Sequence, residues 1–254
     1  MNILEKIISH KRDEISSLEC DILPTTLNKT ISLKKCLSSS GISVIAEIKM
    51  KSPSEGVIFS NADPIQIAKD YESAGAAAIS VLTDKLYFGG SLEILKSVKK
   101  AVSIPVLRKD FIIHKLQINE TFLASADAFL LIAEAIKNHD LKSFIEYGKK
   151  INLETLVEFH SKENLEIIVD SKPSLVGVNC RNLKTMQTDI KYFSEMARLL
   201  PDQLIKVAES GIHTRDDLSY VADQGYNAAL IGTSLMKTKN PGKALEELLG
   251  GYFP

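Results

Sequence analysis

Two phrases near the end of the chain decide its fold: Val207-Ala208-Glu209-Ser210-Gly211 and Leu230-Ile231-Gly232-Thr233-Ser234. Each is an apolar run that ends in a small turn containing glycine. Backbone N–H groups left free at such turns can hold an anion, most often a phosphate. A (β/α)8 barrel often builds a phosphate site from the loops after its last two strands. The two phrases therefore predict such a barrel, working on a phosphorylated small molecule.

The sequence before these phrases supports eight strand–helix units. Apolar runs recur at residues 44–50, 77–83, 106–111, 128–133, 155–159, 176–179, 206–208 and 228–231. Most are continuous, as is typical of parallel strands covered by helices. Asp63-Pro64 and Asn240-Pro241 have the sequence of helix starts. We therefore predict an α/β fold with a (β/α)8 TIM barrel, and a doubly wound open sheet is the structural alternative.

The first 40 residues precede the first predicted strand. Apolar residues fall at helical spacing with charged residues between them, which predicts an amphipathic helix over about residues 2–19. We therefore predict one barrel domain over residues 1–254, with residues 1–40 as an N-terminal helical extension. The extra helix is expected to pack near the catalytic mouth.

Composition argues against several classes of function. The formal net charge of -1 gives no electrostatic reason to expect nucleic acid or an anionic membrane as a partner. The first residues lack the long apolar core of a signal peptide, and no stretch approaches the roughly 20 uninterrupted apolar residues that a membrane helix needs, so we expect neither. Three cysteines without a CxxC pair indicate a reducing cytoplasm. Five histidines without zinc-site spacing lead us to expect no metal and no other cofactor.

Charged and polar residues recur at the C-terminal ends of the predicted strands: Glu47, Lys49, Lys109, Glu158, Asn179, Arg181 and Glu209. In a closed barrel these ends converge on one mouth, where active sites of this fold lie. Charges are also ordinary wherever strands reach the surface, so each residue alone carries little weight. As a set, carboxylates among lysines can supply both a proton donor and a proton acceptor. The polar loop at residues 49–56 fits either a plain turn or a phosphate-gripping lid.

At these residues the chain resembles the indole-3-glycerol phosphate synthase family in its monofunctional form. The matching phrases are Ala46-Glu47-Ile48-Lys49, Lys51-Ser52-Pro53-Ser54, Leu82-Thr83-Asp84, Tyr87-Phe88-Gly89-Gly90-Ser91, Arg108-Lys109-Asp110-Phe111, Leu156-Val157-Glu158, Gly177-Val178-Asn179-Cys180-Arg181-Asn182-Leu183, Ala208-Glu209-Ser210-Gly211-Ile212 and Ile231-Gly232-Thr233-Ser234-Leu235-Met236. Their order extends the resemblance over essentially the whole chain.

The resemblance implies a carboxy-lyase of tryptophan biosynthesis. Its substrate would be 1-(2-carboxyphenylamino)-1-deoxyribulose 5-phosphate, which ring closure, decarboxylation and dehydration convert to indole-3-glycerol phosphate, CO2 and water by side-chain general acid–base catalysis. The catalytic residues implied are Lys109, Glu158, Lys49, Glu47, Asn179 and Glu209. Arg181 would face the substrate carboxylate. The phosphate would bind to Ser52, Ser210, Gly211, Gly232 and Thr233, and the aromatic ring to Phe88, Phe111, Ile132 and Leu183.

Two other functions remain open on the sequence alone. One is another phosphosugar barrel, such as phosphoribosylanthranilate isomerase, which would share the fold and the phosphate loops. The other is a barrel that binds a phosphorylated ligand without catalysis. In each case the expected partner is a phosphorylated small molecule, and we expect a monomer or a weak homo-oligomer.

Overall fold

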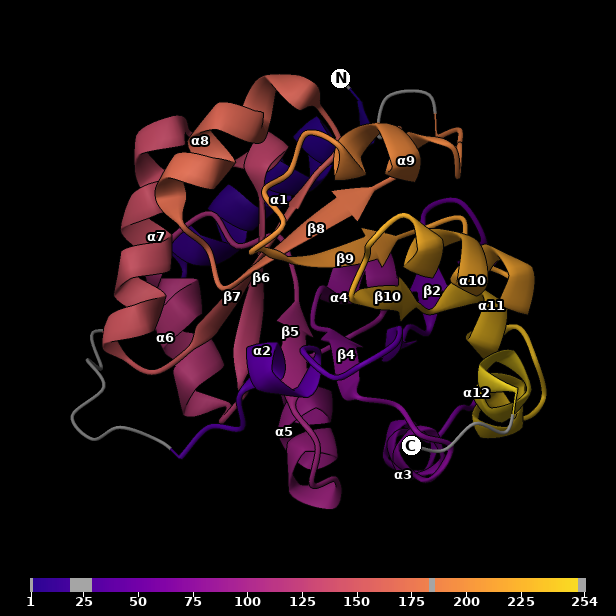
Figure 1. Cartoon of the computed structure of the whole chain (residues 1–254). Coiled ribbons are helices and arrows are strands. Elements are labelled where there is room, and N and C mark those ends of the chain that lie inside the picture. Colours follow the sequence, from indigo (N-terminus) through magenta and orange to yellow (C-terminus); the bar gives the residue numbers. More distant parts are fainter. Residues whose placement is uncertain (1, 19–28, 183–185, 251–254) are drawn as a thin grey trace.

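The computed structural model describes residues 2–18, 29–182 and 186–250 (Figure 1). Eight parallel strands close into a barrel in the order β1-β10-β9-β8-β7-β6-β5-β4. They are β1 (Ser43–Ile48), β4 (Ala78–Leu82), β5 (Val106–Lys109), β6 (Ala128–Ile132), β7 (Glu154–Phe159), β8 (Leu175–Asn179), β9 (Ile205–Glu209) and β10 (Ala228–Ile231). The predicted closed barrel is confirmed, and the open sheet is excluded.

Each predicted strand overlaps an observed one, and the boundaries differ by at most two residues. β5 ends at Lys109, before the predicted end, because the Asp110 side chain accepts a hydrogen bond from the Phe111 N–H at 2.8 Å and the chain turns there. The polar loop after β1 is more ordered than a plain turn. It contains an antiparallel pair, β2 (Lys51–Ser52) with β3 (Gly56–Val57).

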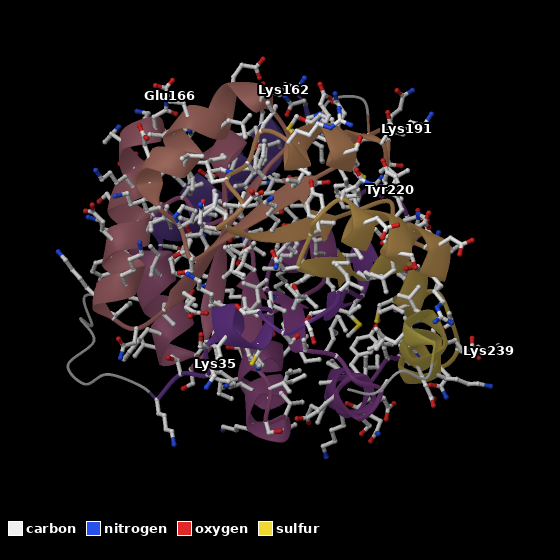
Figure 2. The ribbon with its side chains drawn as sticks, in the orientation of Figure 1. Lys35, Lys162, Glu166, Lys191, Tyr220 and Lys239 are labelled. Atoms are coloured by element: carbon white, nitrogen blue, oxygen red, sulfur yellow. The ribbon has the colours of Figure 1, made fainter. Side chains whose placement is uncertain are left out.

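Helices surround the barrel, as Figure 1 shows. The longer ones are α3 (Pro64–Ser73), α5 (Leu92–Ala101), α6 (Lys115–Leu123), α7 (Asn138–Lys150), α8 (Leu165–Ser171), α9 (Tyr192–Ala197), α10 (Arg215–Asp223) and α12 (Pro241–Leu249), and the short ones α4 (Lys85–Phe88) and α11 (Thr233–Met236). The predicted starts of α3 and α12 are confirmed, since the Asp63 and Asn240 side chains accept backbone N–H groups there. Polar side chains such as Lys162, Glu166 and Lys191 project from the outer faces (Figure 2).

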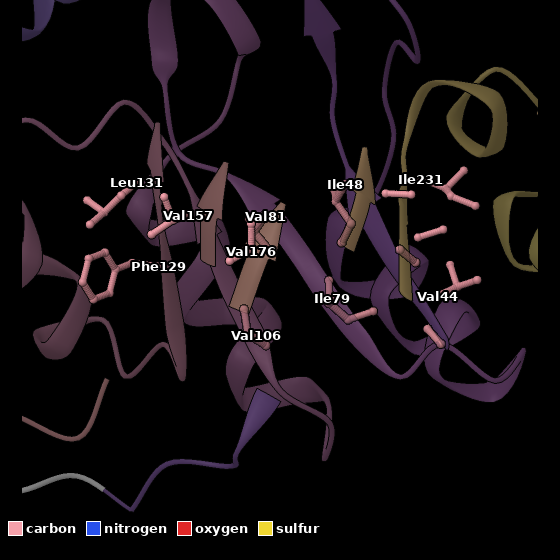
Figure 3. Close-up of a cluster of buried hydrophobic side chains, with 14 of the residues drawn as sticks. Val44, Ile48, Ile79, Val81, Val106, Phe129, Leu131, Val157, Val176 and Ile231 are labelled. Carbon is pink, nitrogen blue, oxygen red and sulfur yellow. The ribbon is translucent and has the colours of Figure 1, made fainter. Parts of the chain in front are cut away.

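Alternation along the strands divides the buried apolar side chains into two layers. Outward-facing residues, among them Val44, Val106 and Phe129, pack against the helices (Figure 3). Inward-facing residues such as Ile45 and Leu107 fill the barrel. Both faces of each strand are therefore buried, one against the helices and one inside the barrel. This explains why the apolar runs of the sequence are continuous.

Helix α2 (Leu33–Cys36) closes one end of the barrel, and the sequence did not predict it. Leu33 and Leu37 are fully buried with the inward-facing residues. The Ser32 hydroxyl donates to a Glu154 carboxylate oxygen at 2.7 Å, at the first residue of β7. The plug therefore lies at the amino ends of the strands and leaves the carboxyl ends for a site.

The predicted N-terminal helix is α1 (Ile3–Ser16), and it is anchored by a buried charge. Lys11 is 3% exposed, and its ammonium lies 3.0 Å from carboxylate oxygens of both Asp84 and Asp110, which follow β4 and β5. Arg108 contacts the other oxygen of Asp110 at 3.0 Å. The network holds α1 against the carboxyl ends of the strands, so the expected position of this helix at the mouth is confirmed.

Within the described ranges, every helix is too short or too polar to traverse a lipid bilayer.

We predict that Lys11→Met lowers the free energy of unfolding by about 3 kcal/mol, because it leaves two buried carboxylates without their ammonium partner. Urea unfolding followed by circular dichroism measures this change. Lys6→Met, an exposed position on the same helix, is the control and should stay within about 0.5 kcal/mol of the parent. Equal effects of the two substitutions would contradict the anchoring role.

We also predict that Asp110 makes the fold acid-sensitive. Burial alone would raise the pKa of this carboxyl group, but Arg108 and Lys11 outweigh burial and lower its pKa from 3.8 to about 2. A lowered pKa stabilises the fold above pH 3.8, and this contribution, about 2 kcal/mol, is lost as the pH falls toward about 2. Urea unfolding of the parent and Asp110→Asn between pH 5 and pH 2.5 should show their difference shrinking. A constant difference would disprove the linkage.

Candidate active site

A single cleft at the carboxyl ends of the strands gathers the predicted site residues. All those within the described ranges line it: Glu47, Lys49, Ser52, Phe88, Lys109, Phe111, Ile132, Glu158, Asn179, Arg181, Glu209, Ser210, Gly211, Gly232 and Thr233. Leu183, also predicted, lies outside the described residues. The cleft has an empty volume of about 1240 Å³, with the open solvent at its mouth included.

Lys109 lies at the centre of the polar half of the cleft. Its ammonium donates to Glu158 Oε2 at 2.8 Å and lies 3.5 Å from Glu209 Oε2. These side chains come from β5, β7 and β9, and each is the last inward-facing residue of its strand. The closure of the barrel brings together residues that are far apart in sequence.

Asn179 fixes the orientation of the Glu158 carboxylate. Its Nδ2 donates to Glu158 Oε1 at 2.7 Å, and its Oδ1 accepts the backbone N–H of Arg181 at 2.9 Å. Both the nitrogen and the oxygen of the Asn179 amide therefore have hydrogen-bond partners. Lys109 donates to the other Glu158 oxygen, so both oxygens of this carboxylate are hydrogen-bonded.

The environment of the cluster shifts the pKa values of Lys109, Glu158 and Glu209 in different directions. Burial alone would lower the pKa of Lys109, but the carboxylates around it, Glu158 foremost, raise that pKa above its ordinary value. Burial and the neighbouring Glu158 raise the pKa of Glu209 well above its usual range. For Glu158, Lys109 outweighs burial and lowers the pKa. Of the two carboxyl groups, Glu209 therefore holds a proton more tightly than Glu158 does.

A second cation, Lys49, lines the same cleft. The Lys49 ammonium lies 2.9 Å from Glu47 Oε1, and Glu47 is buried at the end of β1. Lys49 and Glu47, which alternate along the chain and both line the cleft, thus form an ion pair. The β2–β3 hairpin continues from Lys49, and its Glu55 contacts Lys237, which follows α11, at 2.7 Å. This contact joins the hairpin to the segment after α11, and the hairpin contributes Ser52 to the cleft lining.

The other half of the cleft is apolar. The rings of Phe88 and Phe111 lie 5.9 Å apart, tilted by 33°, and Ile132 is buried beside them in the cleft lining. Helix α1 completes this wall with Ile3, Leu4 and Ile7. A flat aromatic group fits between such surfaces.

The loops after β9 and β10 form the third wall. Ser210 and Gly211 both have left-handed backbone, with φ of 71° and 70°. Such a conformation is unusual for serine, and it turns the chain sharply after Glu209. Gly232 and Thr233 stand at the start of α11 on the neighbouring strand end. These are the two phrases from which the phosphate site was predicted.

Several residues of the cleft were not found from the sequence: Ile3, Leu4, Ile7, Leu82, Leu130, Leu230, Asp110 and Met186 among them. The strand residues among them continue the inward alternation, so their period-two position carried a usable signal. The three α1 residues carried no such signal, because nothing in an amphipathic helix says which partner its apolar face covers.

In the described parts of the chain, no group of three or more histidine, cysteine, aspartate or glutamate side chains is arranged to hold a metal ion.

A solved structure with a similar fold is thiamine phosphate pyrophosphorylase from Pyrococcus furiosus. It superposes with a TM-score of 0.63 at 16% identity, over 86% of this chain and 96% of that chain. At this identity the likeness supports the fold alone.

Curated relatives share far more of the sequence. The indole-3-glycerol phosphate synthase of Shouchella clausii is 44% identical over 248 residues, covering 97% of both chains. That of Koribacter versatilis is 46% identical over 213 residues, covering 84% of this chain and 82% of the relative. That of Aquifex aeolicus is 39% identical over 98% of this chain and all of the relative.

The family model for indole-3-glycerol phosphate synthase matches residues 4–248, which include all of α1 but its first residue and all eight strands of the barrel. The match decides between this family and the other phosphosugar barrels that the sequence left open. The chain belongs to the indole-3-glycerol phosphate synthase family.

Proposed function

We propose that the chain is an active indole-3-glycerol phosphate synthase, a carboxy-lyase of tryptophan biosynthesis. It would convert 1-(2-carboxyphenylamino)-1-deoxyribulose 5-phosphate to indole-3-glycerol phosphate, CO2 and water. The observation that carries the proposal is the Lys109–Glu158–Glu209 cluster, which faces an apolar slot on one side and two glycine turns on the other. The three walls correspond to the reacting centre, the aromatic ring and the phosphate of this substrate.

Ring closure needs a cation beside the ketone oxygen. As the ring carbon that bears the carboxylate attacks the ketone carbon, the oxygen gains negative charge. Lys109 is fully protonated before reaction and can donate to that oxygen. An alkoxide is a stronger base than an amine, so the proton moves to the substrate despite the raised pKa of Lys109. Loss of CO2 then restores the electrons of the C–C bond to the ring system.

Dehydration needs an acid for the departing hydroxyl and a base for the proton that leaves the ring system. Once Lys109 has given up its proton, the Glu158 carboxylate loses the charge that lowered its pKa and becomes a better base. Glu158 is accordingly the acid–base partner. Lys49 is the second cation in reach of the substrate, while Glu47, Asn179 and Glu209 position the two lysines and the substrate hydroxyls.

The rest of the substrate is held away from the reacting centre. Arg181 faces the substrate carboxylate, and the phosphate is bound by Ser52, Ser210, Gly211, Gly232 and Thr233. The aromatic ring occupies the slot of Phe88, Phe111 and Ile132. Binding energy from these remote groups orients the flexible ribulose chain for attack.

The wider setting follows from this proposal. Residues 1–254 act as one catalytic domain, to which the extension over residues 1–40 contributes a wall of the slot. The protein works in the cytoplasm as a monomer or a weak homo-oligomer, without nucleic acid as a partner. The reaction requires no metal and no organic cofactor.

Turnover of the proposed substrate is the direct test. We expect the purified chain to release CO2 and produce indole fluorescence from the carboxyphenylamino-ribulose phosphate, at the same rate in EDTA as in its absence. Inorganic phosphate should inhibit by competing for the glycine turns. Substrate that binds without forming product would instead favour a non-catalytic barrel, and loss of turnover in EDTA that a divalent ion restores would refute metal independence.

Substitution of two lysines distinguishes a residue that acts in the chemical step from one that acts in substrate binding. Lys109→Met keeps much of the side-chain length and removes the charge, so we expect kcat to fall by roughly 10²-fold or more while KM changes little. Lys51→Met, in the hairpin, should act mainly on KM. Steady-state kinetics of both variants measures the two effects. A near-normal kcat for Lys109→Met with loss of activity for Lys51→Met would reverse the assigned roles.

A further inference from the structure

A glycine lies under the Glu209 carboxyl group, in the interior of the barrel. Gly177 is buried in the middle of β8, and Glu209 is the last residue of the neighbouring strand, β9. A Cβ atom built on Gly177 would stand 2.1 Å from Glu209 Oε1, well inside van der Waals contact. The Glu209 side chain therefore occupies the space that any other residue at position 177 would fill.

The backbone does not itself call for glycine at this position. Gly177 is absent from the residues with positive φ, and it pairs in regular parallel register with Glu158 on one side and Val207 on the other. Glycine inside a strand is unfavourable and marks a site where another group approaches closely. Here the approaching group is a carboxyl oxygen.

The approach determines where Glu209 can act. With Oε1 seated over Gly177, Oε2 faces the Lys109 ammonium at 3.5 Å. Oε1 is buried without a hydrogen-bond partner among the described residues. The Glu209 side chain also hydrogen-bonds to the Glu158 side chain, and the niche at Gly177 gives the carboxyl group the room to lie there.

We infer that Gly177 is a positioning residue of this active site: its missing side chain forms the niche that keeps the Glu209 carboxyl group beside Lys109 and Glu158. The inference rests on the proposed function and goes beyond it, because Gly177 touches neither the reacting atoms nor the cleft surface. An added methyl group would push the carboxyl group out of the niche, and Lys109 would keep Glu158 alone as its close partner.

The kinetic test uses Gly177→Ala with two backgrounds. We expect kcat to fall roughly tenfold or more in the parent, with KM changed by less than about threefold. In Glu209→Asp the side chain is one methylene shorter and its oxygens withdraw from position 177. The same methyl group should then lower kcat by less than about twofold. Equal losses in the two backgrounds, or a kcat for Gly177→Ala within about twofold of the parent, would overturn the inference.

Gly148→Ala is the matched control for packing damage. An alanine there would meet the Phe129 ring at 2.7 Å on the outside of the barrel. We expect Gly148→Ala to lower the melting temperature and leave kcat unchanged. For Gly177→Ala we expect the larger effect to be on kcat and the smaller one on the melting temperature. If Gly177→Ala does not fold, recovery of the fold in Gly177→Ala/Glu209→Asp supports the clash with Glu209. Failure of both to fold shows that the methyl group collides elsewhere, and overturns the inference.

A measurement without substrate separates this inference from the proposed function. Carboxyl 13C titration of the full chain, with Glu209 assigned from the spectrum of Glu209→Gln, reports the protonation of the group directly. In Gly177→Ala its midpoint should fall toward the ordinary range, because the group leaves its buried place beside Glu158. An unchanged midpoint overturns the inference even if the parent is active. A parent that does not turn over the substrate refutes the proposed function alone.

Discussion

Closure of eight parallel strands directs every second side chain into a narrow interior, and the other features of the molecule depend on this constraint. Lower positions hold apolar residues such as Ile45 and Val207, with α2 as a plug beneath them. The last inward positions hold Glu47, Lys109 and Glu158. A charge in such a place costs several kcal/mol unless it is paired, so the charged residues had to be arranged as partners of one another.

The charge balance of the cluster explains which groups remain for the substrate. Two ammonium groups, Lys49 and Lys109, face three carboxyl groups, Glu47, Glu158 and Glu209. Each ammonium lies within hydrogen-bond distance of a carboxylate oxygen, Lys49 of Glu47 and Lys109 of Glu158. Both lysines are therefore already paired before a substrate binds, which weakens their attraction for its anionic groups. Binding of an anionic substrate falls to the rim, where Arg181 and the glycine turns stand.

Much of this arrangement was predictable because period-two alternation and parallel closure act locally. Apolar runs located each strand to within two residues, and polar residues at strand ends located the cleft. The contacts of Lys11 with Asp84 and Asp110 were not predictable, since they join residues far apart that no local pattern links. The same holds for the approach of Glu209 to Gly177, which depends on the stagger of neighbouring strands. The α2 plug and the β2–β3 hairpin are too short to leave a periodic signal.

Helix α1 links the stability of the fold to the electrostatics of the site. A helix of 14 residues is marginal on its own, so its order comes from the Lys11 ion pairs and from the apolar side chains that it places on the slot. Asp110, which receives Lys11, directly follows Lys109. Release of α1 would therefore do two things at once. It would expose the slot to water, and it would free the segment that carries the central ammonium. Water in the slot would screen the contacts of Lys109 with its carboxylates, which are strong because the cleft is shielded from solvent. The extension is thus as much a part of the site as the strand ends that it covers.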